Sequence, residues 1–250
     1  MCKFFSFVTN PDNTSDFYYF DAKQRAEDPF DPFGADSHSH ICAYYKINKD
    51  KCNKYEYSPL TRKIFVDTQN ARIDDRARAE RWVKSLDFKT IVEKMIIKPI
   101  ISPLTLPAVD LPTEEQIGWL NEWRSTRERV GVEKELMIYT VVGSAVAEVV
   151  GAELWASVWD AVWNLACGKA ESAIQARIKG EFFSTICAST VCRSIIDASV
   201  AYASSFFDVD YGYDFSAAVK LFESGLVPAY GGDVWLLYSG TEARSVYELR

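Results

Sequence analysis

"SAVAEVVGAELWASVWDAVWNLACGKAESAIQARIKGEFFSTIC", residues 144–187, decides the fold of the second half of this chain. The stretch divides into groups of four residues, and the third residue of every group is apolar. These third residues are Val146, Val150, Leu154, Val158, Val162, Ala166, Ala170, Ile174, Ile178, Phe182 and Ile186. So regular a stripe predicts a repeat that buries one side. The repeat is either a set of helices or a solenoid in which each group forms one side of a turn.

Helices are the preferred interpretation, because the stretch is rich in residues that favour helix, such as Ala, Glu, Lys and Gln. On an α-helix a step of four residues advances a side chain by about 400°, so the stripe drifts by about 40° per group. One long straight helix would therefore turn the stripe away from its neighbour. Gly151, Gly168 and Gly180 are the candidate breaks. The alternative is a β-solenoid, which would suit the Val and Ile residues of the stripe.

Three tryptophans recur at the same spacing: Trp155, Trp159 and Trp163. One interpretation places them in packing between helices. The other is an exposed aromatic stripe that contacts a partner, including a second copy of this chain. These three residues are therefore the candidate partner surface.

The first 70 residues predict strands rather than helices. In "KFFSFVTNPDNTSDFYYFD", residues 3–21, two aromatic runs flank a turn-rich loop, which is typical of a hairpin. "KYEYSPLTRKIFVD", residues 54–67, has the same form around Ser58-Pro59. A helix is predicted from Asp74-Asp75 onward, where the apolar residues Ala79, Trp82, Val83 and Leu86 follow helical spacing.

Prolines 99, 103, 107 and 112 interrupt the middle of the chain, which predicts an extended connector packed along the surface. Thr113 and Gln116 form a capping-box pattern at the start of the next helix. At the end, a short helix capped by Asp214 and stopped by Gly225 precedes a hairpin that turns at Gly231-Gly232.

The predicted fold class is therefore α+β, in four segments. Residues 1–98 form an antiparallel β-rich module with a helix, and residues 99–112 form the proline-rich connector. Residues 113–207 form a mainly α-helical repeat region, and residues 208–250 form a closing helix and β-hairpin.

The composition of the chain argues against several classes of function. Hydrophobic residues make up 48% of the 250 residues, enough for a packed core, and the net charge of −7 indicates no general attraction to nucleic acid. The apolar stretch 136–147 is too short to span a membrane, and the N terminus does not read as a signal peptide. The six cysteines contain no CxxC pair, so no structural zinc is expected. We expect a soluble, intracellular protein with no cofactor.

Both histidines lie in "GADSHSHICAYY", residues 34–45. If this stretch is extended, Asp36, His38 and His40 point to one face, as half of a metal site would. The further histidines of such a site are missing. The preferred interpretation is a metal-free polar rim that contacts a ligand, with Arg25 and Asp21 nearby. The alternative is a metal-assisted hydrolase or transferase that uses Asp36, His38 and His40.

A second group of charges lies between Thr68 and Arg81. The arginines Arg72, Arg76, Arg78 and Arg81 alternate with acidic residues there. Such a pattern is typical of a solvated helix face. The alternative is a contact to a small anion or a nucleotide.

Several stretches together resemble a family of tailed-bacteriophage proteins. They are "FFSFVTNP", "YYFD", "DSHSHI", "CNKYEYSPLT", "WVKSLDFKTIV", "KPIISP", "ASVWDAVW", "YASSFF" and "GLVPAYGGDVWLLYSG". In that family a similar N-terminal module precedes a variable run of four-residue repeats and a closing Gly-Leu-Val-Pro segment. The resemblance spans nearly the whole chain. It implies a viral protein in the host bacterial cytoplasm or, alternatively, in the virion, and it implies no particular activity.

These observations favour a protein that is not an enzyme. We expect a bacteriophage binding protein that inhibits host defence by binding a host bacterial protein or a small nucleotide-like ligand. The alternatives are the metal-assisted enzyme described above and a structural virion component that forms a homo-oligomer through its repeat region.

Overall fold

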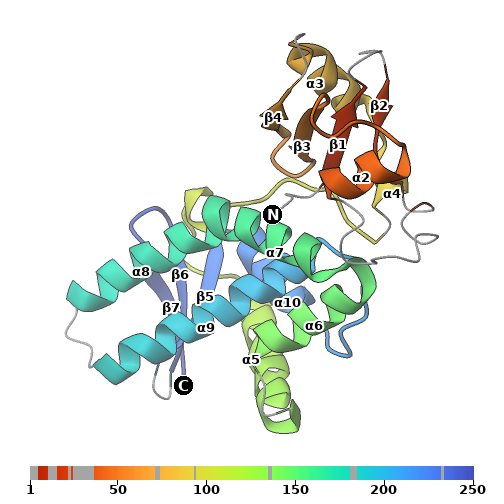
Figure 1. Cartoon of the computed structure of the whole chain (residues 1–250). Helices are drawn as coiled ribbons and strands as arrows, with labels where there is room; N and C mark the ends of the chain where they lie inside the picture. The colour runs from red at the N-terminus through yellow and green to blue at the C-terminus, as the bar shows by residue number, and fades with distance from the viewer. Residues whose placement is uncertain are drawn as a thin grey trace. The chain divides into compact units, whose positions relative to one another are not determined.

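The structure is a computed structural model that describes residues 5–10, 16–21, 24, 37–70, 74–92, 94–134, 137–180, 185–231 and 234–250 (Figure 1). Contacts between Cα atoms divide the chain into two compact units. The first consists of Met1–Lys98 with Val146–Val158, and the second of Pro99–Ala145 with Trp159–Arg250. Helices and antiparallel sheets make up the described chain, so the predicted α+β class is confirmed.

The first unit is built on a four-stranded sheet with the strand order β2-β1-β3-β4, in which all neighbours are antiparallel. The strands are β1 (Phe5–Thr9), β2 (Phe17–Tyr18), β3 (Asn53–Ser58) and β4 (Lys63–Gln69). Strands β1 and β2 form the first predicted hairpin and β3 and β4 the second, so both predictions are confirmed. The pairing of β3 with β4 shifts register between Lys54 and Tyr55, which marks a β-bulge.

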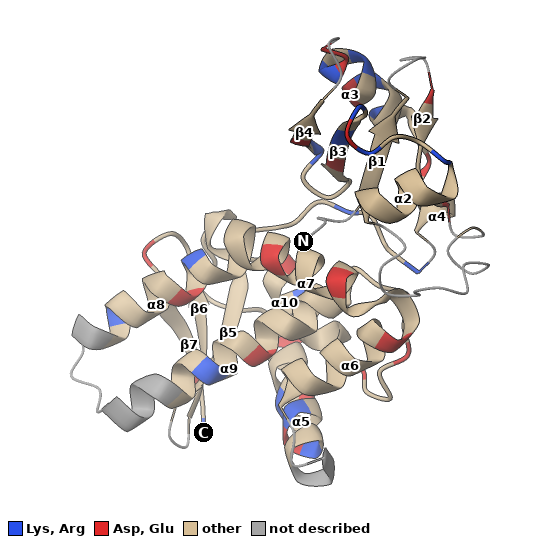
Figure 2. Cartoon of the chain, viewed as in Figure 1, with Lys and Arg blue, Asp and Glu red and all other residues tan. Residues whose placement is uncertain are grey.

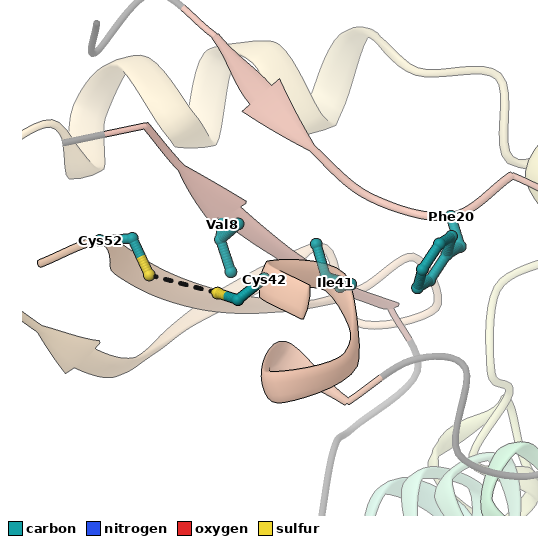
Figure 3. Packing of buried hydrophobic residues seen from close by; sticks show 5 residues of the cluster. All are labelled: Val8, Phe20, Ile41, Cys42 and Cys52. Atoms are coloured by element: carbon teal, nitrogen blue, oxygen red, sulfur yellow. Dashed lines mark hydrogen bonds between the residues drawn. The ribbon is translucent and has the colours of Figure 1, made fainter. Parts of the chain in front are cut away.

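Helices cover both faces of this sheet. They are α2 (His38–Tyr44), α3 (Arg76–Ser85) and α4 (Phe88–Ile91). Neighbouring residues of a strand point to opposite faces, and every residue of β1 is buried. Val8 lies in a cluster with Ile41 of α2 (Figure 3), whereas the ring of Phe7 lies 4.9 Å from that of Trp82 of α3. The helix predicted from Asp74-Asp75 is therefore confirmed as α3, and its Trp82 packs on the sheet.

The proline-rich connector belongs to the second unit. It contains one 3-10 turn, η1 (Pro103–Thr105), and two of its amides donate hydrogen bonds to side chains distant in the sequence. The Ile101 amide donates to the hydroxyl of Tyr202 at 2.8 Å, and the Val109 amide donates to the hydroxyl of Ser239 at 3.0 Å. The connector is therefore packed, as predicted, and it contributes to the fold of this unit.

The repeat region is helical, so the β-solenoid alternative is wrong. The helices of this half are α5 (Glu114–Lys134), α6 (Ile138–Val150), α7 (Ala152–Val162), the π-helical turn η2 (Trp163–Cys167), α8 (Gly168–Gly180), α9 (Thr185–Ser204) and α10 (Ser216–Glu223). Thr113 and Gln116 exchange the two capping-box hydrogen bonds before α5. No helix among the described residues is long and apolar enough to cross a membrane.

The three glycines predicted to break the repeat helix differ in whether the helix breaks at them. Gly151 separates α6 from α7 with a positive φ of 94°, so the helix breaks there as predicted. Gly168 is not a break, because the chain passes through η2 into α8 with helical backbone angles. Gly180 is the last residue of α8.

The closing segment has one strand more than predicted. Helix α10 and the left-handed Gly225 that follows it agree with the prediction, and the Ser216 amide donates to the Asp214 carboxylate at 2.8 Å. The predicted hairpin is a three-stranded antiparallel sheet of β5 (Leu226–Gly231), β6 (Val234–Ser239) and β7 (Arg244–Leu249). Most of β7 is exposed or half-buried, so its sequence lacks the apolar run that indicated the other two strands. Gly232 of the predicted turn lies outside the described residues.

Candidate functional site

The predicted polar face around the two histidines does not form. Residues 38–44 are helix α2 rather than an extended segment, and the Ser37 hydroxyl caps it by accepting from the His40 amide at 3.2 Å. On an α-helix, side chains two positions apart differ by about 200° around the helix axis, so His38 and His40 point to opposite sides. Asp36 and Arg25, the other predicted members, lie outside the described residues.

His38 has a structural role at the β-bulge. It is 7% exposed, and its Nε2 lies 2.9 Å from the carbonyl oxygen of Tyr55, where the register of β3 shifts. A carbonyl only accepts, so Nε2 carries the proton. Nδ1 lies 3.5 Å from the carboxylate of Asp67 on β4. The hydrogen bond of His38 thus connects the start of α2 to β3.

The other predicted site residues that the structure describes, His40 and Asp21, also make contacts within the protein. The ring of His40 meets that of Phe20 edge-on, with centroids 5.5 Å apart. Asp21 and Gln24 cap each other through two reciprocal hydrogen bonds of 3.0 and 2.8 Å, and the Gln24 amide group donates to the Tyr45 hydroxyl at 2.6 Å. Within the described ranges, no group of three or more His, Cys, Asp or Glu residues is placed to hold a metal ion.

The predicted tryptophan stripe is not exposed as a whole. Trp155 is buried, whereas Trp159 and Trp163 are half-buried, with ring centroids 5.3 Å apart. The drift of about 40° per group separates the first tryptophan from the third by about 80° around the helix, so the three do not share one environment. Trp159 also meets Tyr139 of α6 edge-on at 5.8 Å.

A pocket in the first unit is a better candidate site. It has a volume of about 380 Å³, which lies in the range of about 300–1,000 Å³ typical of small-molecule sites. The β3–β4 turn, the end of α3, α4 and the chain just before the connector form its walls. Its lining residues are Tyr57, Pro59, Arg62, Lys84, Leu86, Asp87, Phe88, Lys89 and Ile97. We call this site the basic pocket.

Two aromatic rings and three cations define the chemistry of the basic pocket. The rings of Tyr57 and Phe88 stack with centroids 5.3 Å apart and an interplanar angle of 30°. Arg62, Lys84 and Lys89 supply positive charge, and Asp87 is the one acidic residue of the lining. The Asp87 carboxylate accepts from the Lys89 amide at 3.1 Å, so it also caps α4.

Two of the three cations, on separate elements, act on the Tyr57 hydroxyl. Burial raises the pKa of Tyr57, and the positive charges of Lys84 and Arg62 oppose that rise. Lys84 is on α3 and pairs with Glu80 at 2.6 Å, whereas Arg62 is on the β3–β4 turn. Helix α3 carries basic residues along its length (Figure 2). Folding therefore places cations that are far apart in the sequence around one aromatic floor.

The backbone of Arg62 is unusual. Its φ of 56° lies in the left-handed region, which glycine adopts freely and which costs other residues about 1–2 kcal/mol. An arginine at this position keeps a guanidinium group at the pocket rim at the expense of backbone strain. Strained backbone of this kind is often found at functional sites.

The sequence did not point to the basic pocket. Of the arginines that it singled out, Arg72 is outside the described residues, and Arg76, Arg78 and Arg81 are not in the pocket lining. Arg78 pairs with Asp75 at 3.2 Å and covers the ring of Phe17. Arg62, Lys84 and Lys89 form no local motif, so only the fold brings them together. No protein-family model, no curated protein and no solved structure matches this chain. The geometry of the site is therefore the basis for a functional assignment.

Proposed function

We propose that this protein is a non-enzymatic binding protein of a bacteriophage, and that its basic pocket holds a small nucleotide-like ligand. The observation that carries this proposal is the convergence of Arg62, Lys84 and Lys89 around the stacked rings of Tyr57 and Phe88. By holding such a ligand, the protein would withdraw it from a host defence pathway.

Each part of the ligand has a matching part of the pocket. A guanidinium group binds a phosphate through two parallel hydrogen bonds, and an ammonium group binds it as a point charge. Arg62 and the two lysines therefore suit a phosphate. A flat heterocyclic base suits the aromatic floor, because rings stack on or meet other rings at centroid distances of about 4.5–7 Å.

Withholding a ligand requires affinity and no chemical step. The enzyme alternative depended on Asp36, His38 and His40 facing one another, and α2 turns the two histidines apart. The virion alternative uses the repeat region as an assembly surface, and of the three tryptophans there Trp155 is buried. Binding in the basic pocket depends on neither.

Co-purification tests this proposal. The full-length protein is expressed in bacteria, purified at low salt and denatured, and the released small molecules are identified by mass spectrometry. We expect a phosphate-bearing compound with a heterocyclic base. The yield should fall in Arg62→Ala and Lys89→Ala proteins and stay unchanged in Lys63→Ala, whose exposed lysine lies outside the pocket lining.

Equal recovery of that compound from Arg62→Ala, Lys89→Ala and wild-type protein would place the ligand elsewhere and overturn the proposal. Recovery of a host protein in stoichiometric amount, with no small molecule, would favour the protein-partner alternative instead.

A further inference from the structure

Two cysteines of the first unit lie in contact. The sulfur of Cys42, on α2, lies 3.6 Å from the sulfur of Cys52, which directly precedes β3 (Figure 3). Their exposed fractions are 2% and 0%, and both belong to the buried cluster that contains Val8, Phe20 and Ile41. Neither contributes to the basic pocket.

The turn between the two cysteines holds this geometry. The Ile47 amide donates to the Cys42 carbonyl at 2.8 Å, and the Lys51 amide donates to the Asn48 carbonyl at 3.1 Å. The thiol of Cys52 also lies 3.6 Å from the Lys49 carbonyl. The approach of the two sulfurs is thus set by a hydrogen-bonded turn and a packed core.

The two sulfurs are not equivalent. The Cys52 thiol donates to the Lys49 carbonyl, so its sulfur is left to accept from the Cys42 thiol. This hydrogen bond lowers the pKa of Cys52 to about 7 and raises the pKa of Cys42. Burial opposes the decrease at Cys52, and the nearby charge of Lys54 assists it. Because the thiolate is the reactive form of cysteine, the lowered pKa favours Cys52 over Cys42 as the attacking sulfur.

We propose that Cys42 and Cys52 are a modification site, a buried dithiol that a peroxide oxidises to an intramolecular disulfide. The Cys52 thiolate attacks one peroxide oxygen, the O–O bond breaks, and the departing hydroxide takes up a proton to become water. The Cys42 sulfur then attacks the sulfur of the Cys52 sulfenic acid, forms the S–S bond and releases a second water. Two thiols are oxidised, and one peroxide is reduced to two waters.

The modification requires movement and has a structural consequence. Because Cys52 is 0% exposed, the turn between α2 and β3 must open locally to admit the peroxide. The sulfurs must approach from 3.6 Å to about 2.05 Å, the length of a disulfide bond. The bond would close the loop from α2 to β3, and a closed loop limits the conformations of the unfolded chain. Oxidation would therefore make the first unit more resistant to unfolding.

Peptide mapping of the oxidised protein tests the site. The full-length protein is treated with hydrogen peroxide, remaining thiols are alkylated with iodoacetamide, and the protein is digested without reductant. We expect one linked pair of peptides that joins Cys42 to Cys52, lacks the mass of two hydrogen atoms and separates on reduction. The Cys42→Ser protein should lose this link, and the Cys192→Ser protein should keep it.

The wild-type map is decisive even if a cysteine variant fails to fold. Absence of the link in treated wild-type protein overturns the proposal, as does a link that joins Cys42 or Cys52 to another cysteine. Sulfinic acid on Cys52 without any link also overturns it, because Cys42 would then have failed to trap the sulfenic acid.

Discussion

At the scale of single residues, His38 is placed as a structural side chain rather than a ligand. Replacing it by alanine leaves the carbonyl of Tyr55 buried at the β-bulge without the hydrogen bond at 2.9 Å. An unsatisfied buried polar group costs about 1–3 kcal/mol. We expect the His38→Ala protein to lose about that much free energy of unfolding, measured by urea denaturation.

His40→Ala is the matched control, because it removes the same side chain from the same helix. Its ring meets that of Phe20 edge-on, and such pairs contribute about 0.5–1.5 kcal/mol. His40→Ala should therefore destabilise the protein less than His38→Ala. A larger loss in the His40 variant would contradict the structural role of His38.

Arg62 lines the basic pocket in a strained backbone conformation. Its φ of 56° suits glycine, so Arg62→Gly relieves backbone strain, although glycine gains more freedom in the unfolded chain. We expect the free energy of unfolding to stay unchanged or to rise by up to about 1 kcal/mol. Urea denaturation measures it, and a clear loss of stability would contradict the strain at this position.

Asp75 makes the first unit sensitive to acid. It is buried, and its carboxylate accepts from the Tyr55 hydroxyl, from Asn53 at 2.9 Å and from Arg78 at 3.2 Å. Burial alone would raise the pKa of Asp75, but these hydrogen bonds together lower it below its ordinary value of 3.8. The ionised form therefore stabilises the fold above that value, and this contribution is lost as the pH falls through the folded pKa.

Asp75→Asn should accordingly be less stable than wild type at neutral pH, and the difference should shrink as the pH falls below 3.8. Urea denaturation of both proteins across the acid range, at constant ionic strength, measures this difference. A difference that stays constant down to acid denaturation would contradict the assignment.

At the scale of elements, the four-residue stripe is buried although its spacing does not match an α-helix. Its described members Val146, Leu154, Val158, Val162, Ala166, Ala170, Ile174 and Ile178 are buried, and Val150 is half-buried. Phe182 and the side chain of Ile186 are not described. Two features correct the drift. Gly151 interrupts the helix, and η2 contains π-type hydrogen bonds, which take about one more residue per turn.

Gly151→Ala tests the break between α6 and α7. No atom lies within 4 Å of the added Cβ, so the cost comes only from the positive φ of 94° and should be about 1–2 kcal/mol. Gly118→Ala, inside α5 and equally unobstructed, should instead stabilise the protein by about 0.5–1 kcal/mol. Thermal unfolding compares the two, and a gain for Gly151→Ala would mean that the helix continues through this position.

The elements that the sequence predicts well are those with a strong local signal. Aromatic alternation indicated both hairpins of the first unit, and helical spacing indicated α3. The π turn had no local signal, because Trp163–Cys167 read as ordinary helix. Strand β7 is as long as β5 and β6, but none of its residues is buried, so it lacks the apolar run by which a strand is recognised. The shared face of Asp36, His38 and His40 requires an extended stretch, and this condition is not met because Ser37 caps a helix there.

At the scale of the whole chain, each unit draws on segments that are distant in the sequence. The connector is held by Tyr202 and Ser239, more than 90 residues further along, and Arg244 pairs with Asp110 at 3.1 Å. The predicted segment limits at 98, 112 and 207 stay a prediction. Local patterns carry no information on such pairings, since they depend on which surfaces the folded chain brings together.

The basic pocket also could not be predicted from local sequence patterns. Arg62, Lys84 and Lys89 each read as ordinary surface charges, and Tyr57 and Phe88 as core residues. Only the packing of the β3–β4 turn against α3 and α4 makes them one site. The predicted histidine site failed for the opposite reason, because a sharp local spacing was not matched by the fold.

The most direct test of the proposed function is isothermal titration calorimetry of the full-length protein with ADP as the probe. We expect saturable binding to one site. Arg62→Ala should weaken it by about 10–100-fold, because hydrogen bonds to a charged group contribute about 1.5–3 kcal/mol. Lys63→Ala, which removes the same charge from the neighbouring residue outside the pocket lining, should bind as wild type does. Absence of binding to wild type, or equal affinity in the Arg62→Ala protein, would contradict a nucleotide-like ligand in the basic pocket.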